Sequence, residues 1–162
     1  MVKPLLEKRW STSELAKVFK IPATNLFGWR QRYSFPGPIR PGAQGPGYEH
    51  DIIDVVLIAM ALRLIAFGLK PDKACWAEWP IKAQVHGLLE DIPDEDAGTK
   101  PETPMSPLLA VDPGGEHWFF TKPDQLGEVM NGRDAMLVID LKKIVRDTLD
   151  RFGQTIGKEV TK

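Results

Sequence analysis

The longest apolar stretch of this sequence runs from Ile52 to Phe67, and its only charged residues are Asp54 and Arg63. Its 16 residues are fewer than the roughly 20 that a membrane-spanning helix needs, and the two charges also disfavour a membrane anchor. We therefore expect a buried helix over residues 49–67. A helix that is apolar nearly all round must be covered on most of its faces, and this requirement constrains the rest of the fold.

The cover for this helix can come from two sources, the C-terminal region of the same chain or a second copy of it. The 162 residues are 43% hydrophobic and 27% charged, which is typical of a soluble globular protein with one sizeable core or two small ones. The lone Cys75 excludes an internal disulfide framework, and the first seven residues lack the apolar run of a secretory signal. We expect a cytoplasmic protein that does not associate with membranes.

Upstream of the apolar stretch, the residues WSTSELA contain a helix start. Glu14 follows Ser11 at the spacing of a capping box, so a helix should begin at Thr12. The helix should end before Ile21-Pro22, because proline disfavours the helical conformation in the residue that precedes it. The apolar face of this helix comprises Leu15, Ala16, Val18 and Phe19.

A second short helix is predicted from residue 23 or 24 to Tyr33. Its inward residues are Leu26, Trp29 and Tyr33, and its outward residues are Asn25, Arg30, Gln31 and Arg32. Two short helices joined by a tight turn, the second carrying arginines, indicate a helix-turn-helix.

The segment FPGPIRPGAQGPGY, residues 35–48, contains four prolines and four glycines, which forbid a regular helix or a central strand. It is either a plain linker or a wing that rests on a nucleic-acid backbone, with Arg40 and Gln44 at its tip. Its position, directly before a long apolar helix, favours the wing.

The formal charge is unevenly distributed, at +5 over residues 1–70, −5 over residues 71–107 and −1 over residues 108–162. A basic first unit indicates a polyanionic partner, and major-groove reading requires short polar side chains near a helix start together with arginines. We expect Thr24 and Asn25 to contact bases or phosphates, and Arg30 and Arg32 to contact phosphates. The candidates for the flanking DNA backbone are Lys17, Lys20, Arg40 and Tyr48.

The sequence WSTSELAKVFKIPATNLFGWRQRY, the Pro/Gly segment, GYEHDIIDVV and AFGLKPDKA together resemble the MerR-like winged helix-turn-helix regulators over residues 9–75. The resemblance implies a bacterial or phage transcriptional regulator that binds double-stranded DNA as a homodimer and is associated with the nucleoid. It also implies that the second helix enters the major groove and that the wing lies over the adjoining backbone. Two alternatives remain open: an architectural or excisionase-like factor, and a protein-interaction adaptor that retains the fold.

The C-terminal residues predict a small α+β unit. Strands are expected over 108–112, 116–121 and 135–140, with a turn at 113–115 between the first two. Asp140 should cap a final helix that lies across the sheet. The apolar face of that helix comprises Leu141, Ile144, Val145, Thr148, Leu149 and Phe152. About 50 residues sustain an independent core with difficulty, so we expect this unit to dock on the apolar helix or to pair with another copy.

No catalytic or metal-binding pattern stands out. His117 lies near Asp112 and Glu116, but a histidine beside Trp118 in a hairpin is more often packed than catalytic. Cys75 and the three histidines lack metal-ligand spacing, and no phosphate-binding loop occurs, so we expect neither an enzyme nor a cofactor. An aromatic sheet face of Trp118, Phe119 and Phe120 would serve a protein partner or a small-molecule effector.

The predicted fold is mainly α with a small β component. It comprises a winged helix-turn-helix domain over 1–75, an interrupted helix and an acidic, proline-rich linker over 76–107, and the α+β unit over 108–162. The interruption is expected at Trp79-Pro80.

Overall fold

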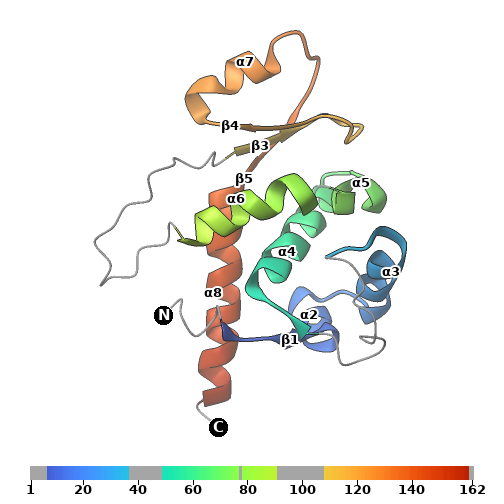
Figure 1. Ribbon diagram of the computed structural model, residues 1–162, viewed down its shortest axis with the longest axis vertical. Helices are drawn as coiled ribbons and strands as arrows, with labels where there is room; N and C mark the ends of the chain where they lie inside the picture. The colour runs from blue at the N-terminus through green and yellow to red at the C-terminus, as the bar shows by residue number, and fades with distance from the viewer. Residues whose placement is uncertain (1–6, 37–48, 77, 91–107, 161–162) are drawn as a thin grey trace, which may run out of the picture.

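The apolar helix α4 lies at the centre of a mainly helical protein, whose described residues also form two small antiparallel sheets (Figure 1). The structure is a computed structural model that describes residues 7–36, 49–76, 78–90 and 108–160. Its elements are β1 (Trp10–Ser11), α2 (Thr12–Phe19), α3 (Ala23–Tyr33), β2 (Glu49–His50), α4 (Ile52–Ala66), α5 (Pro71–Trp76), α6 (Glu78–Glu90), β3 (Leu108–Val111), β4 (Trp118–Thr121), η1 (Pro123–Gln125), α7 (Leu126–Met130), β5 (Leu137–Asp140) and α8 (Leu141–Val160). No helix among the described residues is long and apolar enough to span a bilayer.

The start of α4 differs from the prediction, which placed it at Glu49. Asp51 is the N-cap, and its Oδ1 accepts a hydrogen bond from the backbone N–H of Asp54 at 3.0 Å. The two residues before this cap are extended and form β2, which pairs antiparallel with β1, His50 opposite Trp10. An aspartate at the N-cap satisfies a free N–H of the first turn, so the helix begins after Asp51 and the preceding residues remain available for pairing.

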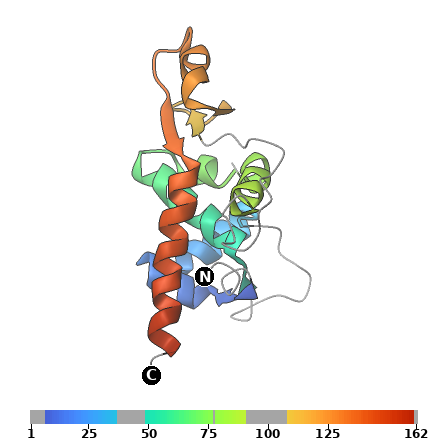
Figure 2. The ribbon, with the colours of Figure 1, turned by 90° about the vertical axis from the view of Figure 1, so that its left-hand side faces the viewer.

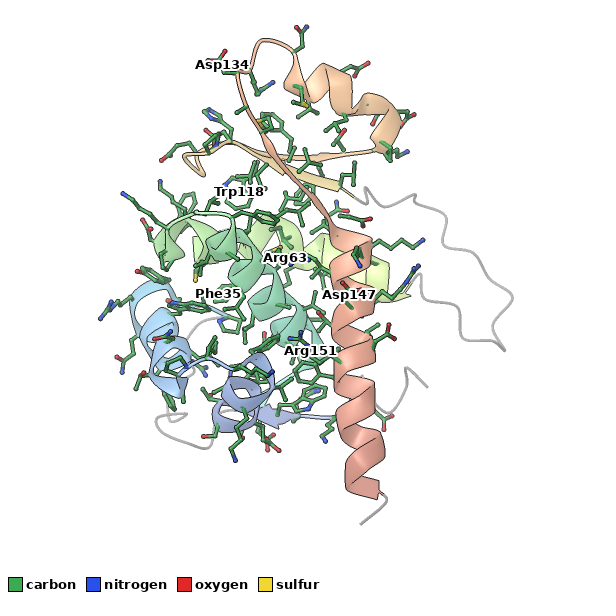
Figure 3. The ribbon with its side chains drawn as sticks, turned by 180° about the vertical axis from the view of Figure 1, so that it is seen from behind. Phe35, Arg63, Trp118, Asp134, Asp147 and Arg151 are labelled. Carbon is green, nitrogen blue, oxygen red and sulfur yellow. The ribbon has the colours of Figure 1, made fainter. Side chains whose placement is uncertain are left out.

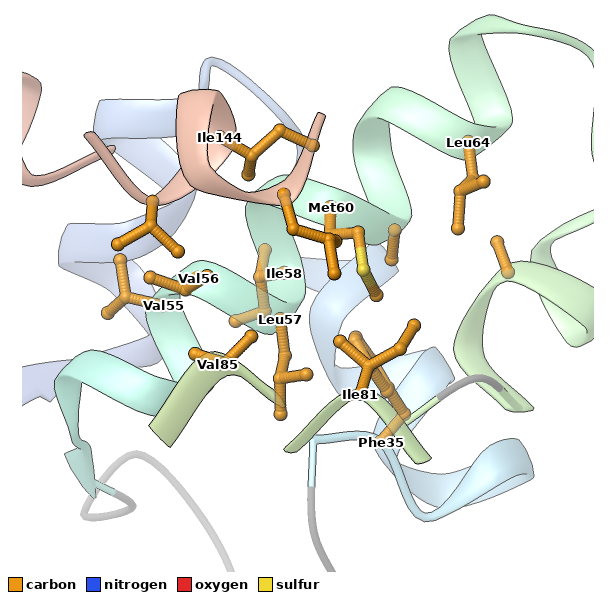
Figure 4. Close-up of a cluster of buried hydrophobic side chains, with 14 of the residues drawn as sticks. Phe35, Val55, Val56, Leu57, Ile58, Met60, Leu64, Ile81, Val85 and Ile144 are labelled. Carbon is orange, nitrogen blue, oxygen red and sulfur yellow. The ribbon is translucent and has the colours of Figure 1, made fainter. Parts of the chain in front are cut away.

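Cover for α4 comes from the same chain. Helices α6 and α8 both pack against it, and Leu57, Ile58, Met60 and Leu64 are fully buried (Figure 4). Ile81 and Val85 of α6 and Ile144 of α8 belong to the same buried cluster. A helix with apolar side chains on almost every face is therefore enclosed by helices that follow it in sequence.

Helix α8 runs along the long axis of the molecule, from the three-stranded sheet at one end to β1 and α2 at the other (Figures 1 and 2). All six residues predicted for its apolar face are buried, and Asp140 accepts a hydrogen bond from the backbone N–H of Lys143 at 2.8 Å. Near the far end, the Phe152 ring centroid lies 5.3 Å from that of Trp10 and 5.5 Å from that of Phe19. The helix does not lie across the sheet as predicted, because its apolar stripe packs along α4.

The C-terminal sheet has the strand order β4-β3-β5 and is antiparallel throughout. Successive side chains of a strand point to opposite faces, so the predicted continuous aromatic face does not form. Trp118 and Phe120 pack against the helical core, whereas Phe119 lies on the other face beneath the guanidinium of Arg133, 4.3 Å from its ring centroid. The three aromatic side chains therefore do not share one face of the sheet.

The hairpin between β3 and β4 is held by Asp112. Its Oδ1 accepts hydrogen bonds from the backbone N–H groups of Glu116 at 2.7 Å and His117 at 3.1 Å. These hydrogen bonds, that from the His117 backbone first, hold the pKa of the Asp112 carboxyl below its usual value. Gly115 in the turn has a φ of +71°, and a Cβ there would lie 2.8 Å from Cβ of Lys73 on α5. The turn therefore packs against the helical part of the chain.

The interruption predicted at Trp79-Pro80 does not occur there, because both residues lie inside α6 (Glu78–Glu90). Pro80 lies in the first turn of α6 as described, and residue 77, between α5 and α6, lies outside the described residues. A proline is tolerated in the first turn, because its missing N–H has no intrahelical partner there.

Candidate nucleic-acid interface

The candidate interface is built on α2, α3 and the turn between them, and its first component is the capping box of α2. The Ser11 Oγ accepts a hydrogen bond from the Glu14 backbone N–H at 3.2 Å, and Glu14 Oε2 accepts from the Ser11 backbone N–H at 2.7 Å. The Ser11 hydroxyl also donates to that carboxylate at 2.7 Å. These hydrogen bonds, that of the hydroxyl first, lower the pKa of Glu14. The predicted helix start at Thr12 is confirmed.

A tight turn over residues 20–22 joins α2 to α3. Lys20 adopts the left-handed conformation at φ 58°, and the backbone N–H of Ile21 donates to the carbonyl of Ala16 at 3.0 Å. This hydrogen bond satisfies a carbonyl at the end of α2. The side chains of Lys17 and Lys20 are both exposed, and Lys20 lies four residues before Thr24 at the start of α3. The turn therefore places cationic side chains next to the beginning of the second helix.

One face of α3 is polar and exposed. Thr24 and Gln31 are seven residues apart, as are Asn25 and Arg32, and all four side chains are exposed. Seven residues make almost two helical turns, so these four side chains lie along the same face. Gly28 lies midway along this face, and a Cβ built there would meet nothing within 4 Å. The polar face of α3 (residues 24, 25, 28, 31 and 32) thus carries side chains at both ends and open space between them.

The opposite face of α3 is buried in the protein. Leu26 and Trp29 are part of the core, and the Trp29 ring centroid lies 6.3 Å from that of Phe35. Helix α3 packs against α2 and α5 and lies at the edge of the molecule in Figure 1. Packing on one side only leaves the polar face of α3 uncovered among the described residues.

Arg30 does not belong to the polar face. Only 7% of Arg30 is exposed, so the prediction that it is available to a ligand was wrong. The physical reason is helical spacing, because Leu26, Trp29, Arg30 and Tyr33 follow one another at i, i+3, i+4 and i+7 and therefore share the inward face. The helical spacing was readable in the sequence, but the charge of Arg30 favoured the interpretation that its side chain faces outward.

The wing and two of the predicted contact residues, Arg40 and Tyr48, lie in the segment 37–48, outside the described residues. Among the described residues, β2 takes part in a buried polar cluster that the sequence did not indicate. The Thr12 hydroxyl and Nε2 of His50 are 3.1 Å apart, and Nδ1 of His50 lies 3.5 Å from the carboxylate of Asp54. All three residues are buried, so β2 is joined to the first turns of α2 and α4.

The other candidate site, around His117, is arranged differently from the prediction. Its side chain is 68% exposed instead of packed, and its Nδ1 lies 3.3 Å from Asp112. The carboxylate of Asp112 holds the hairpin turn, so it has a structural function in this pair. Within the described ranges, no group of three or more His, Cys, Asp or Glu side chains could hold a metal ion.

Comparison with known proteins adds no assignment to this geometry: no family model matches the chain, and the search of curated proteins finds no relative.

Proposed function

We propose that this chain is a DNA-binding transcriptional regulator of the MerR-like winged helix-turn-helix type, in which α3 lies in the major groove. The observation that carries the proposal is the polar face of α3, whose side chains at both ends are exposed while the opposite face is anchored in the core. The major groove is about 12 Å wide, which matches the diameter of a helix with its side chains.

In this proposal, the exposed side chains of α2, the turn and α3 contact different parts of the DNA. Thr24 and Asn25, in the first turn of α3, reach base edges or phosphates, since the free N–H groups of a helix start attract an anion. Arg32, at the other end of the same face, contacts a phosphate. Lys17 and Lys20 contact the flanking backbone from α2 and the turn. Arg30 takes no part in the contacts, because it is buried.

Gly28 gives the proposal a physical requirement that can be tested. A glycine inside a helix lowers stability by roughly 0.5–1 kcal/mol relative to alanine. No neighbour within 4 Å of a built Cβ explains the glycine through packing. In the proposed complex the missing side chain allows the α3 backbone to approach the floor of the groove.

A single helix of 11 residues reads only a few base pairs, so we further propose a homodimer on a pseudo-palindromic site, associated with the nucleoid. The wing, in the segment 37–48, would contact the backbone beside each half-site.

The test is capture of fragments from a genomic library by the purified full-length chain at 50 mM and 200 mM salt. We expect a few fragments to be enriched, with an affinity that falls steeply between the two salt concentrations. Arg32→Ala should weaken binding and reduce the magnitude of the salt slope by about 1, whereas Arg146→Ala, an exposed arginine on α8, should do neither. Retention of no fragment above the nonspecific background would reject the proposal.

A matched pair of glycine variants tests the orientation of α3. Gly28→Leu and Gly153→Leu each place a side chain in the open space beside a helix. Only Gly28→Leu should lower DNA affinity, because only that side chain would enter the groove. Equal affinities of the two variants would place the DNA on another face of the protein.

A further inference from the structure

A hollow of about 290 Å³ opens between α4 and α8, next to the end of α2. It is lined by Phe19, Ala59, Leu62, Arg63, Ala66, Ile144, Asp147, Thr148 and Arg151. Arg63, Asp147 and Arg151 are labelled in Figure 3, where they come from the two helices that border the hollow. Its volume is near the lower end of the range of about 300–1,000 Å³ for small-molecule sites, so it suits a ligand of roughly ten non-hydrogen atoms.

The floor of this hollow is mostly apolar, with the buried Thr148 as a polar member. Ile144 is buried, and Phe19, Ala59 and Leu62 are half-buried, so each presents hydrocarbon or aromatic surface to the space. Alanines at positions 59 and 66 keep the space open, since larger side chains on that face of α4 would fill it. An apolar floor favours an occupant with a hydrocarbon or aromatic body.

The rim is charged, with a positive balance. Arg63 and Arg151 are exposed, and each carries a cationic guanidinium group. The negative charge of Asp147 is offset locally by Lys143, whose Nζ lies 3.0 Å from its carboxylate. The Arg63 guanidinium lies 5.9 Å from the ring centroid of the exposed Phe67, directly after α4.

We propose that this hollow binds a small amphipathic anion, an aliphatic or aromatic carboxylate, with its apolar body on the floor and its carboxylate between Arg63 and Arg151. Guanidinium groups bind carboxylates through charge-assisted, often bidentate hydrogen bonds. A cationic ligand would face two arginines, and a neutral apolar ligand would make no use of the rim.

The site is independent of the proposed interface but contacts it through one residue. Phe19 is the last residue of α2, the helix that precedes the turn into α3. A bound ligand would therefore touch α2, α4 and α8 together and increase the stability of their packing. This inference needs no DNA binding, so it can fail or hold separately from the proposed function.

The experiment is a titration of the full-length, isotopically methyl-labelled protein, followed by NMR, with three matched probes: octanoate, octanol and octylamine. We expect submillimolar octanoate to shift the methyl signals of Ile144 and Leu62 and to raise the melting temperature. Octanol and octylamine should bind at least tenfold more weakly. Shifts of the same size with octanol would reduce the site to an apolar hollow and overturn the proposal, and no shift with octanoate would also overturn it.

Variants identify the groups that bind the carboxylate. Arg63→Gln and Arg151→Gln should each weaken octanoate binding about tenfold, whereas Arg146→Gln should leave it unchanged. Ala59→Leu, which fills the floor, should abolish binding, with Ala83→Leu on an exposed position of α6 as its control. Circular dichroism shows whether each variant is folded. If one variant fails to fold, the remaining variants still test the proposed site. A second copy of the chain could instead occupy the hollow. Sedimentation would then show self-association that octanoate does not disrupt, and the Ile144 and Leu62 signals would shift as the protein is diluted. That result would show the proposal to be wrong.

Discussion

Replacing Gly28 by alanine should make this protein more stable. The residue lies in the middle of α3, its φ is outside the left-handed range, and an added Cβ meets nothing within 4 Å. Alanine reduces the conformational freedom of the unfolded chain and introduces no clash. We expect a gain of about 0.5–1 kcal/mol in the free energy of unfolding, which corresponds to about 1–4 °C in melting temperature for a chain of this length.

Two further glycines provide matched controls. Gly153 in α8 is also open to a Cβ, so Gly153→Ala should give a similar gain. Gly115→Ala should instead lose roughly 2–4 kcal/mol, because it combines a left-handed backbone with a Cβ 2.8 Å from Lys73 Cβ. Gly132→Ala has the same backbone cost at φ +73° but no close neighbour. The difference between the costs of Gly115→Ala and Gly132→Ala therefore measures the clash with Lys73.

Chemical and thermal unfolding followed by circular dichroism measures all four variants. A loss of stability in Gly28→Ala beside a gain in Gly153→Ala would refute the reasoning, since it would mean that the glycine in α3 has a packing function. A cost of Gly115→Ala no larger than that of Gly132→Ala would refute the contact between the hairpin and α5.

Three other predictions concern the anchors of the fold. Phe152→Ala should lower the free energy of unfolding by about 3–5 kcal/mol, because the ring is fully buried against two other aromatic rings; a loss below about 1 kcal/mol would contradict the docking of α8. Ser11→Ala should lower the free energy of unfolding by about 1 kcal/mol at pH 7 and by less near pH 3, measured by urea unfolding. The pKa of Glu14 is depressed in the folded state, so the stabilisation from Glu14 is present above its unfolded pKa and is lost as the pH falls through its folded pKa. An equal cost at both pH values would exclude this linkage. Arg30→Ala should destabilise the fold in the same assay while Arg32→Ala should not, and equal effects would contradict their difference in burial.

Local signals in the sequence were sufficient for most helix and strand positions. The capping box at Ser11, the proline after Ile21 and the apolar stripe that begins at Leu141 each act within a few residues, and the structure has the corresponding elements. The direction of α8 could not be predicted in the same way, because an apolar stripe specifies that a helix face is buried but not which surface buries it.

The candidate site was predictable only in part. Lys17, Lys20, Thr24, Asn25 and Arg32 are exposed as required for contact with a partner. Arg30 was misassigned because its charge was given more weight than its helical position. The hollow between α4 and α8 is a product of tertiary packing between residues about 80 positions apart, and no local pattern could reveal it.

The enclosure of α4 by α8 also has a consequence for biosynthesis. On a ribosome, 86 residues must be added after Ala66 before Phe152 exists, which takes about 4–17 s at typical rates of elongation. Throughout that interval the most apolar segment of the nascent polypeptide is not yet covered by α8, so we expect it to bind ribosome-associated chaperones. Premature termination anywhere ahead of the last helix would release a product that is prone to aggregate.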